Sequence, residues 1–194
     1  MKLHDYITVL PGMPTDICED IISLFENNEE CHIRRDKDGM QNFTELNVAN
    51  FFPELNAILA KKIKCVREDY MDRTPQEPIF PYMWGLEEFR IKRYNEGDCF
   101  KQHVDVGDLN SARRFLAFLF YLNDDFEGGG TMFRTPDVKY IKPEKGSVLV
   151  FPPTWQYPHE GLAVTKGTKY ILSTYLHYVA PPPGVHSPSI PNYQ

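Results

Sequence analysis

The chain has 194 residues, of which 42% are hydrophobic and 25% are charged, and its formal net charge at pH 7 is −6. This length is enough for a proper apolar core, and we expect residues 1–194 to form a single domain. The negative charge argues against electrostatic capture of nucleic acid phosphates, so no nucleic acid partner is expected. The aromatic share of 13% and the 16 prolines favour a β-dominated fold over a helical bundle.

The sequence predicts a cytoplasmic protein with no membrane partner. Residues 1–5 carry no apolar signal region, and no run of the chain approaches membrane-spanning length. The four cysteines form no CxxC pair, which indicates free thiols rather than a disulfide framework. They are Cys18, Cys31, Cys65 and Cys99.

Residues 1–82 are expected to form a helical support region. Apolar residues recur at helical spacing over 15–27, which predicts an amphipathic helix. The longest helix signal covers 53–71, which begins with a proline and repeats apolar residues every three to four positions. Residues 5–10 read as a short strand, and 31–44 read as strand and turn.

After a Pro-rich connector at 72–82, residues 83–179 change to short β-like runs divided by Gly, Pro, Asn and Asp. The runs are 86–94, 99–106, 113–122, 131–134, 138–141, 147–151, 156–160 and 168–178. Short strands preceded by helices indicate a mainly β (α+β) protein with a double-stranded β-helix core, the jelly-roll or cupin-like arrangement. The tail at 180–194 is too Pro-rich for a regular element.

A candidate metal centre combines His103 and Asp105 with a distant third ligand, His159. If His103 and Asp105 lie on an extended segment, the side-chain period of two residues places them on one face. Two imidazoles and one carboxylate leave metal positions open, which suits non-haem Fe(II) that must also bind a co-substrate and O2. Since a lone HxD is common by chance, the surrounding motifs decide this hypothesis.

Those motifs form an ordered series along the chain. They are RYNEGD at 93–98, YLN at 121–123, GGGTMF at 128–133, PEKG at 143–146, HEG at 159–161 and GTKY at 167–170. Over residues 86–178 the series resembles the prolyl 4-hydroxylase type of 2-oxoglutarate- and Fe(II)-dependent dioxygenases. The resemblance implies that His103, Asp105 and His159 are the iron ligands and that Lys169 receives the distal carboxylate of 2-oxoglutarate.

A lysine in that position is chemically suitable, because its ammonium is a point charge with three donors. Strand parity places Lys169 and Ser173 on one face, so both can point into the same cavity. The resemblance also implies that Tyr94, Tyr121 and Thr131 line the co-substrate. The alternatives are an exposed strand lysine, core aromatics and a strand threonine.

Four further residues are weighed as substrate contacts. Arg90 and Lys92 share parity with Tyr94, so they either reach the cavity mouth or are solvated charges at an edge. The solvated interpretation is favoured for Lys92, and Arg90 stays a candidate. Trp155 and Tyr157 could form an aromatic wall for a prolyl ring, although packing explains them equally well.

The leading functional hypothesis is a prolyl 4-hydroxylase-like, procollagen-proline 4-dioxygenase-like enzyme. It would hydroxylate a proline in a peptide or protein and convert 2-oxoglutarate to succinate and CO2, with Fe(II), O2 and stimulatory ascorbate. The first alternative is the same chemistry on free proline, another amino acid or a small metabolite. The second is a non-catalytic jelly-roll binding module.

Overall fold

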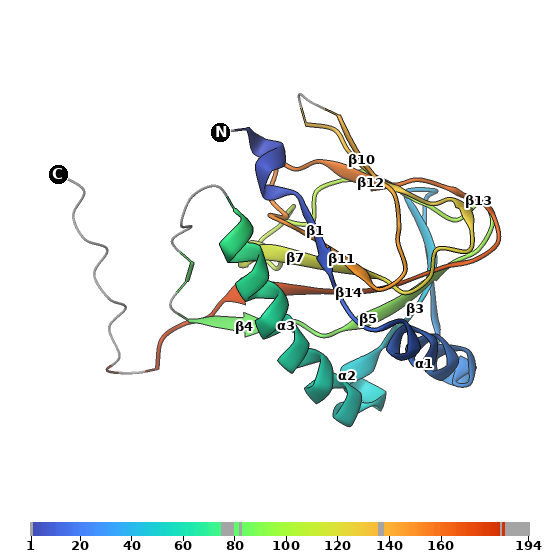
Figure 1. Cartoon of the computed structure of the whole chain (residues 1–194), viewed down its shortest axis with the longest axis horizontal. Helices are drawn as coiled ribbons and strands as arrows, with labels where there is room; N and C mark the ends of the chain where they lie inside the picture. The colour runs from blue at the N-terminus through green and yellow to red at the C-terminus, as the bar shows by residue number, and fades with distance from the viewer. Residues whose placement is uncertain (1, 75–79, 82, 136–137, 183, 185–194) are drawn as a thin grey trace.

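The structure is a computed structural model, and it describes residues 2–74, 80–81, 83–135, 138–182 and 184 (Figure 1). Most of the connector predicted at 72–82 and of the tail predicted at 180–194 lies outside these residues. No helix in the described part is long and apolar enough to cross a membrane. All four cysteines are described, and all four are free.

One curled antiparallel sheet dominates the described chain. Its strands are β1 (Thr8–Pro11), β2 (Ile33–Lys37), β3 (Gln41–Asn47), β4 (Trp84–Leu86), β5 (Arg90–Tyr94), β6 (Phe100–His103), β7 (Arg114–Tyr121), β9 (Thr131–Phe133), β10 (Lys139–Ile141), β11 (Ser147–Phe151), β12 (His159–Gly161) and β14 (Lys169–Tyr178). Their order is β1-β11-β7-β14-β5-β3-β6-β12-β9-β10, with β2 beside β3 and β4 beside β14. Two short strands, β8 (Glu127–Gly128) and β13 (Val164–Lys166), pair separately. The mainly β, jelly-roll prediction is confirmed.

The curl of the sheet creates an inside and an outside. The short strands β6, β12, β9 and β10 continue from β3 through one registered pair, Gln41 with Phe100. In Figure 1, β12 and β10 lie away from α1, α2 and α3. Aromatic and aliphatic side chains fill the space inside the curl, among them Tyr94, Tyr121 and Phe133. The candidate metal ligands belong to this inner side.

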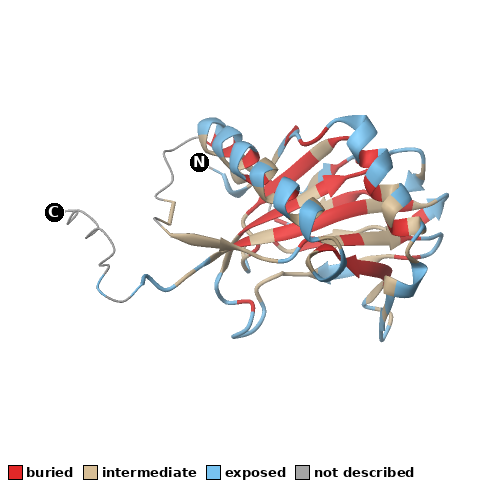
Figure 2. Ribbon diagram, turned by 90° about the horizontal axis from the view of Figure 1, so that it is seen from below, coloured by how far each residue is buried: buried red, intermediate tan, exposed pale blue. Residues whose placement is uncertain are grey.

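Helices cover the outside of the long strands, where Figure 2 shows buried strands behind helices with an exposed outer face. They are α1 (Thr15–Glu26), α2 (Val48–Phe51) and α3 (Pro53–Arg73), and two 3₁₀ turns lie at Leu3–Tyr6 and Glu29–Cys31. Both long helices, α1 and α3, were predicted. Each has an apolar stripe that packs on the sheet. Residues such as Ile21 of α1 and Ile63 of α3 pack with Leu172 of β14 in one buried cluster.

Several strand boundaries differ from the prediction: β6 ends at His103 although 99–106 was predicted, and β12 begins at His159 although 156–160 was predicted. The predicted strand 86–94 is interrupted, because the Glu87 amide donates to the Tyr175 carbonyl and the Phe89 carbonyl accepts from the Val48 amide. Residues 5–10 were predicted as one strand, but the chain makes a 3₁₀ turn before β1 begins at Thr8. Neither interruption changes the alternation of side chains on β5 or β14.

The expectation of a helical support region in 1–82 describes only part of that segment. β3 lies inside the main sheet between β5 and β6, and β1 pairs with β11 at its edge. The long helices of this segment do cover the sheet, as expected. Its strands complete the same sheet that carries the candidate site.

Candidate active site

The structure brings the three predicted metal ligands together. His103 ends β6 and His159 begins β12, and the two residues are direct cross-strand partners. The Nε2 atom of His103 lies 3.4 Å from one Asp105 oxygen, and Nε2 of His159 lies 3.7 Å from the other. One ligand atom from each residue falls within 4.8 Å of the other two, so a single cation can contact all three.

Backbone carbonyls orient both imidazoles. Nδ1 of His103 lies 2.7 Å from the Lys101 carbonyl, and Nδ1 of His159 lies 3.1 Å from the Tyr157 carbonyl. Because a carbonyl only accepts, each Nδ1 carries the proton and donates it. Each Nε2 therefore keeps its lone pair and faces the Asp105 carboxylate, which is the form that binds a metal.

The electrostatics of the three residues also fit a cation. Burial alone would raise the pKa of Asp105, but interaction with His159 and then with His103, when these imidazoles are protonated at low pH, brings it to about 2. Burial lowers the pKa of His159, and the Asp105 charge offsets this only in part. At neutral pH the site thus offers an ionised carboxylate and a neutral His159 imidazole.

Lys169 lies in the same cavity as the three ligands. The residue is 3% exposed, its ammonium donates to the Gly129 carbonyl at 2.6 Å, and it lies 5.2 Å from the ring centre of Tyr94. Burial, with a smaller contribution from Lys92, lowers the pKa of Lys169 to about 7. Among the described residues no carboxylate pairs with Lys169, so an anionic ligand would supply the missing counter-charge.

A glycine allows this close approach to Lys169. Gly129 has a φ of +63°, and a Cβ built there would lie 2.7 Å from the Phe126 ring and 3.2 Å from the Lys169 side chain. A larger residue would therefore be strained and would crowd the lysine that its own carbonyl holds. Gly128 ends β8, and Gly129 and Gly130 connect it to β9, so this stretch positions the cation.

The predicted lining residues other than Tyr121 share the cavity with Lys169. Along β14, Lys169, Ile171, Ser173 and Tyr175 all line it, which confirms the predicted strand parity. Tyr94 and Thr131 also line it. Tyr121 is fully buried beside the cavity, where its hydroxyl and that of Thr131 lie 2.8 Å apart.

Asp105 reaches the centre in a way that strand parity did not anticipate. β6 ends at His103, and Asp105 lies in a bend beyond it rather than on an extended segment. Arg114 fastens this bend by donating to the Asp105 carbonyl at 3.1 Å, while Glu87 binds the same guanidinium through two bonds of 2.8 Å. The Arg114 guanidinium also lies 4.1 Å from the ring centre of Tyr175.

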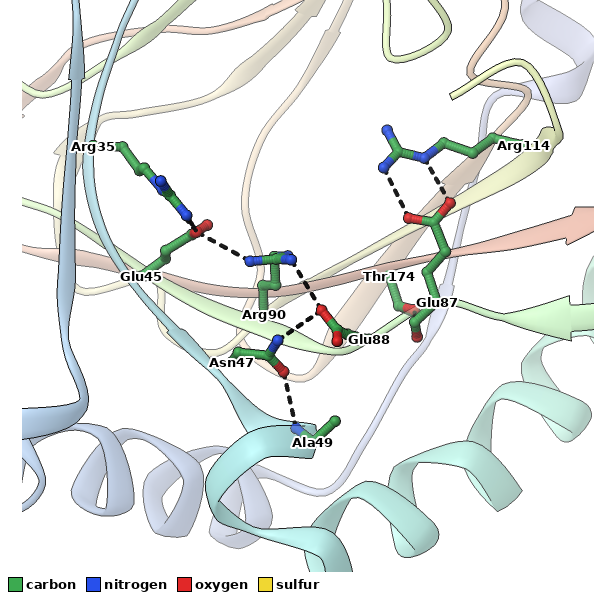
Figure 3. A network of polar contacts seen from close by, with 9 residues as sticks. All are labelled: Arg35, Glu45, Asn47, Ala49, Glu87, Glu88, Arg90, Arg114 and Thr174. Carbon is green, nitrogen blue, oxygen red and sulfur yellow. Dashed lines mark hydrogen bonds and ion pairs between the residues drawn. The ribbon is translucent and has the colours of Figure 1, made fainter. Parts of the chain in front are cut away.

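Arg90 and Lys92 follow Tyr94 outward along one face of β5, and both border a charged mouth next to the metal cavity. Arg90 donates to Glu45 at 3.1 Å and to Glu88 at 3.0 Å, as Figure 3 shows. Lys92 lines both the mouth and the metal cavity. The solvated interpretation favoured for Lys92 is therefore wrong, because β5 turns this side chain inward.

Trp155 and Tyr157 do not form an aromatic wall at the cavity. Trp155 is 75% exposed, and the Tyr157 ring is buried in the inner apolar cluster. Neither ring lines the metal cavity or the mouth beside it. What Tyr157 contributes is its backbone carbonyl, which holds His159.

Sequence reasoning also missed several residues that the structure places at the site. Lys101 and Tyr157 act through carbonyls, for which no side-chain pattern exists, and Arg114 reaches Asp105 only because of the bend between β6 and β7. Tyr175 could have been found, since it shares the parity of Lys169. The functional roles of all these residues stay predictions.

Two imidazoles with free Nε2 atoms, an ionised carboxylate and a nearby lysine that has no carboxylate partner in the described chain fit a divalent metal with an anionic co-ligand. The fold and the site together define a double-stranded β-helix with a candidate two-histidine, one-carboxylate metal centre. Comparisons with known proteins narrow this class. Residues 89–177 match the family model of the 2OG-Fe(II) oxygenase superfamily. Over this segment, which is less than half of the chain, the sequence is similar to that superfamily.

Curated relatives match over limited lengths. A probable prolyl 4-hydroxylase of Arabidopsis thaliana is 31% identical over 135 residues, covering 56% of this chain and 46% of that protein. A multifunctional procollagen lysine hydroxylase and glycosyltransferase of Rattus norvegicus is 40% identical over 52 residues, covering 27% of this chain and 7% of that protein. The chain therefore matches less than half of either relative.

Solved structures match over most of the chain. A viral collagen prolyl hydroxylase from Paramecium bursaria Chlorella virus-1, in complex with 2-oxoglutarate, has a TM-score of 0.67 at 22% identity and covers 90% of this chain and 97% of its own. A Trichoplax adhaerens prolyl hydroxylase bound to a hypoxia-inducible-factor peptide fragment has a TM-score of 0.69 at 14% identity, covering 89% and 84%. At these identities the likeness establishes the fold.

Proposed function

We propose that this protein is an Fe(II)- and 2-oxoglutarate-dependent dioxygenase that hydroxylates a prolyl residue of a peptide or protein. The observation that carries the enzyme class is the buried Lys169 ammonium, without a carboxylate partner in the described chain, in the same cavity as His103, Asp105 and His159. A jelly-roll module that only bound a partner would not need these four groups together. The prolyl substrate is supported by the names of the relatives and of the similar structures.

In this proposal the protein holds, orients and shields the reactants. His103 and His159 bind the metal through Nε2, and Asp105 supplies the negative ligand. Fe(II) with O2 supplies the oxidising chemistry that inserts oxygen into a C–H bond and converts 2-oxoglutarate to succinate and CO2. Lys169 binds the distal carboxylate, which fixes the orientation of the co-substrate. Apolar side chains of the cavity lining, such as Tyr94 and Ile171, exclude water.

The first test measures succinate formation from 2-oxoglutarate with Fe(II) and ascorbate, with and without proline-containing peptides. We expect peptide-stimulated turnover that both His159→Ala and Lys169→Ala abolish. Lys61→Ala, on the exposed face of α3, is the matched control and should keep wild-type turnover.

Other outcomes redirect or end the proposal. Turnover that no peptide stimulates would keep the oxygenase and point to free proline, another amino acid or a small metabolite. Absence of turnover together with absence of Fe(II) binding would contradict the enzyme and leave a binding module. Omitting ascorbate tests separately whether it stimulates the reaction.

A further inference from the structure

A second lysine faces the metal cavity. On β5, Lys92 is the register partner of Ile171, and Tyr94 is the partner of Lys169. The Lys92 side chain therefore lies about 7 Å nearer the mouth than Lys169, on the same inner face. Lys92 lines both the metal cavity and the charged mouth, so it lies where the two meet.

The cross-strand neighbour of Lys92 does not neutralise it. That neighbour is Glu45, 5% exposed, on β3. Its Oε1 accepts two bonds from Arg35, at 2.8 and 2.7 Å, and one from Arg90 at 3.1 Å (Figure 3). The two arginines hold the Glu45 carboxylate, and Lys92 forms no ion pair with it.

The other charged groups of the mouth are also paired among themselves. Glu88 binds Arg90 and accepts from Asn47 at 2.6 Å, and Glu87 binds Arg114 through two bonds. Within the described part of the chain, Lys92 has neither a hydrogen bond nor an ion pair. Its nearest aromatic contact is the Phe43 ring, whose centre lies 5.0 Å from the ammonium.

When metal and co-substrate are both bound, Lys92 is expected to have no anionic partner. In the proposed function, one carboxylate of 2-oxoglutarate binds the metal and the other binds Lys169. Burial lowers the pKa of Lys92, and attraction to Glu45 and Asp105 offsets this in part. A half-buried ammonium beside the metal ligands, without a bonded anion, is suited to an anionic group that arrives with the substrate.

We propose that Lys92 binds a carboxylate of the primary substrate, so that the enzyme selects substrates with a carboxylate close to the carbon that reacts. This inference rests on the proposed function, because it assumes that Lys169 is occupied by the co-substrate. Two sources offer the same chemistry: the α-carboxylate of a free amino acid and an acidic side chain next to the target residue of a peptide. Lys92 is thus a specificity-determining residue.

The test measures binding by calorimetry, using protein loaded with Mn(II) and saturated with 2-oxoglutarate so that no turnover occurs. The probes are two matched pairs: L-proline with L-prolinamide, and acetyl-Glu-Pro-Gly-amide with acetyl-Gln-Pro-Gly-amide. We expect the carboxylate member of at least one pair to bind about tenfold or more tightly than its amide partner. The pair that shows this preference identifies the source of the carboxylate.

Variants connect the preference to Lys92. Lys92→Met should reduce it to less than about twofold, whereas Lys92→Arg should retain most of it because the positive charge remains. Lys61→Met, an exposed lysine of α3, should leave it unchanged. The same titrations give the dissociation constant of 2-oxoglutarate for each variant, which shows that the site has formed.

Three results would overturn the inference: no preference in either pair, a preference that survives in Lys92→Met, or a loss in Lys92→Met that affects 2-oxoglutarate rather than the probes. Failure of the proposed function is seen separately. If wild-type protein with Mn(II) does not bind 2-oxoglutarate at all, the co-substrate site itself is absent.

Discussion

At the scale of single residues, the surroundings of Lys169 predict that binding of the proposed co-substrate depends on pH. Burial lowers its pKa to about 7, so the ammonium is charged below that pH and loses its proton above it. A bound carboxylate requires the charged form. The affinity for 2-oxoglutarate should therefore be constant below about pH 7 and fall by up to about tenfold per pH unit above it.

The measurement is the dissociation constant of 2-oxoglutarate with Mn(II) between pH 6 and 9, by calorimetry in two buffers of different ionisation enthalpy. Above pH 7 the wild type should take up a proton on binding. Lys169→Arg should show neither this uptake nor the decline, because a guanidinium stays charged. A flat wild-type profile would mean that Lys169 is not the group that binds the carboxylate.

The sequence predicted the side chains of the candidate site, but not the backbone groups that hold them in place. His103, Asp105, His159 and Lys169 were predicted from the family resemblance of their flanking motifs, and the structure brings them to one cavity. The carbonyls that fix both imidazoles could not be predicted, since any residue type supplies a carbonyl. Lys92 was misjudged although it shares the parity of Tyr94, because parity does not say how far from the cavity mouth a side chain lies.

At the scale of elements, the bend after β6 depends on Arg114 of β7. This arginine holds the Asp105 carbonyl and is itself fixed by Glu87. Arg114→Met should weaken divalent metal binding by about tenfold, because Asp105 would lose its fixed position. Titration of Co(II) into the protein, followed by its absorption spectrum, measures this directly.

Arg113→Met is the matched control, since the neighbouring Arg113 is exposed and should leave the metal affinity unchanged. Equal affinities of the wild type and Arg114→Met would show that the bend holds its shape without this contact. Far-UV circular dichroism of each variant verifies that the sheet is formed.

The packing of α3 on the sheet gives a second prediction at this scale. Ile63 is fully buried in the cluster between the helices and β14, whereas Ile58 of the same helix is 62% exposed. Ile63→Ala should lower the free energy of unfolding by about 2–5 kcal/mol, through lost burial and the cavity that remains. Urea unfolding measures this, and Ile58→Ala should change it by less than about 0.5 kcal/mol.

Helices and strands differed in how well the sequence predicted them. Both long helices were found because their apolar stripes come from local residues. The break between β4 and β5 was not found, because it depends on hydrogen bonds between residues that are distant in the sequence. The Glu87 amide donates to the Tyr175 carbonyl, and the Val48 amide donates to the Phe89 carbonyl. The position of β3 between β5 and β6 was not predicted for the same reason, because the partners of a strand are residues far away in the sequence.

At the scale of the whole molecule, the candidate site spans the curl of the sheet. His103 and His159 come from the short strands β6 and β12, whereas Lys169 comes from the long strand β14 on the other side of β5 and β3. A metal alone would connect only the ligands on and beside β6 and β12. A co-substrate bound to both the metal and Lys169 would join the two parts of the sheet and stabilise the folded state as a unit.

This arrangement predicts an ordered pattern of thermal stability. Mn(II) should raise the melting temperature, and 2-oxoglutarate should raise it further only when Mn(II) is present. Each ligand at about 100 times its dissociation constant contributes about 2.7 kcal/mol, or roughly 5–10 °C for a chain of this size. Lys169→Met should retain the increase from Mn(II) and lose the increase from 2-oxoglutarate, whereas His159→Ala should lose both. If 2-oxoglutarate stabilised the protein equally without Mn(II), the metal and the co-substrate would occupy separate sites, and the cavity would not be the shared centre that its lining residues indicate.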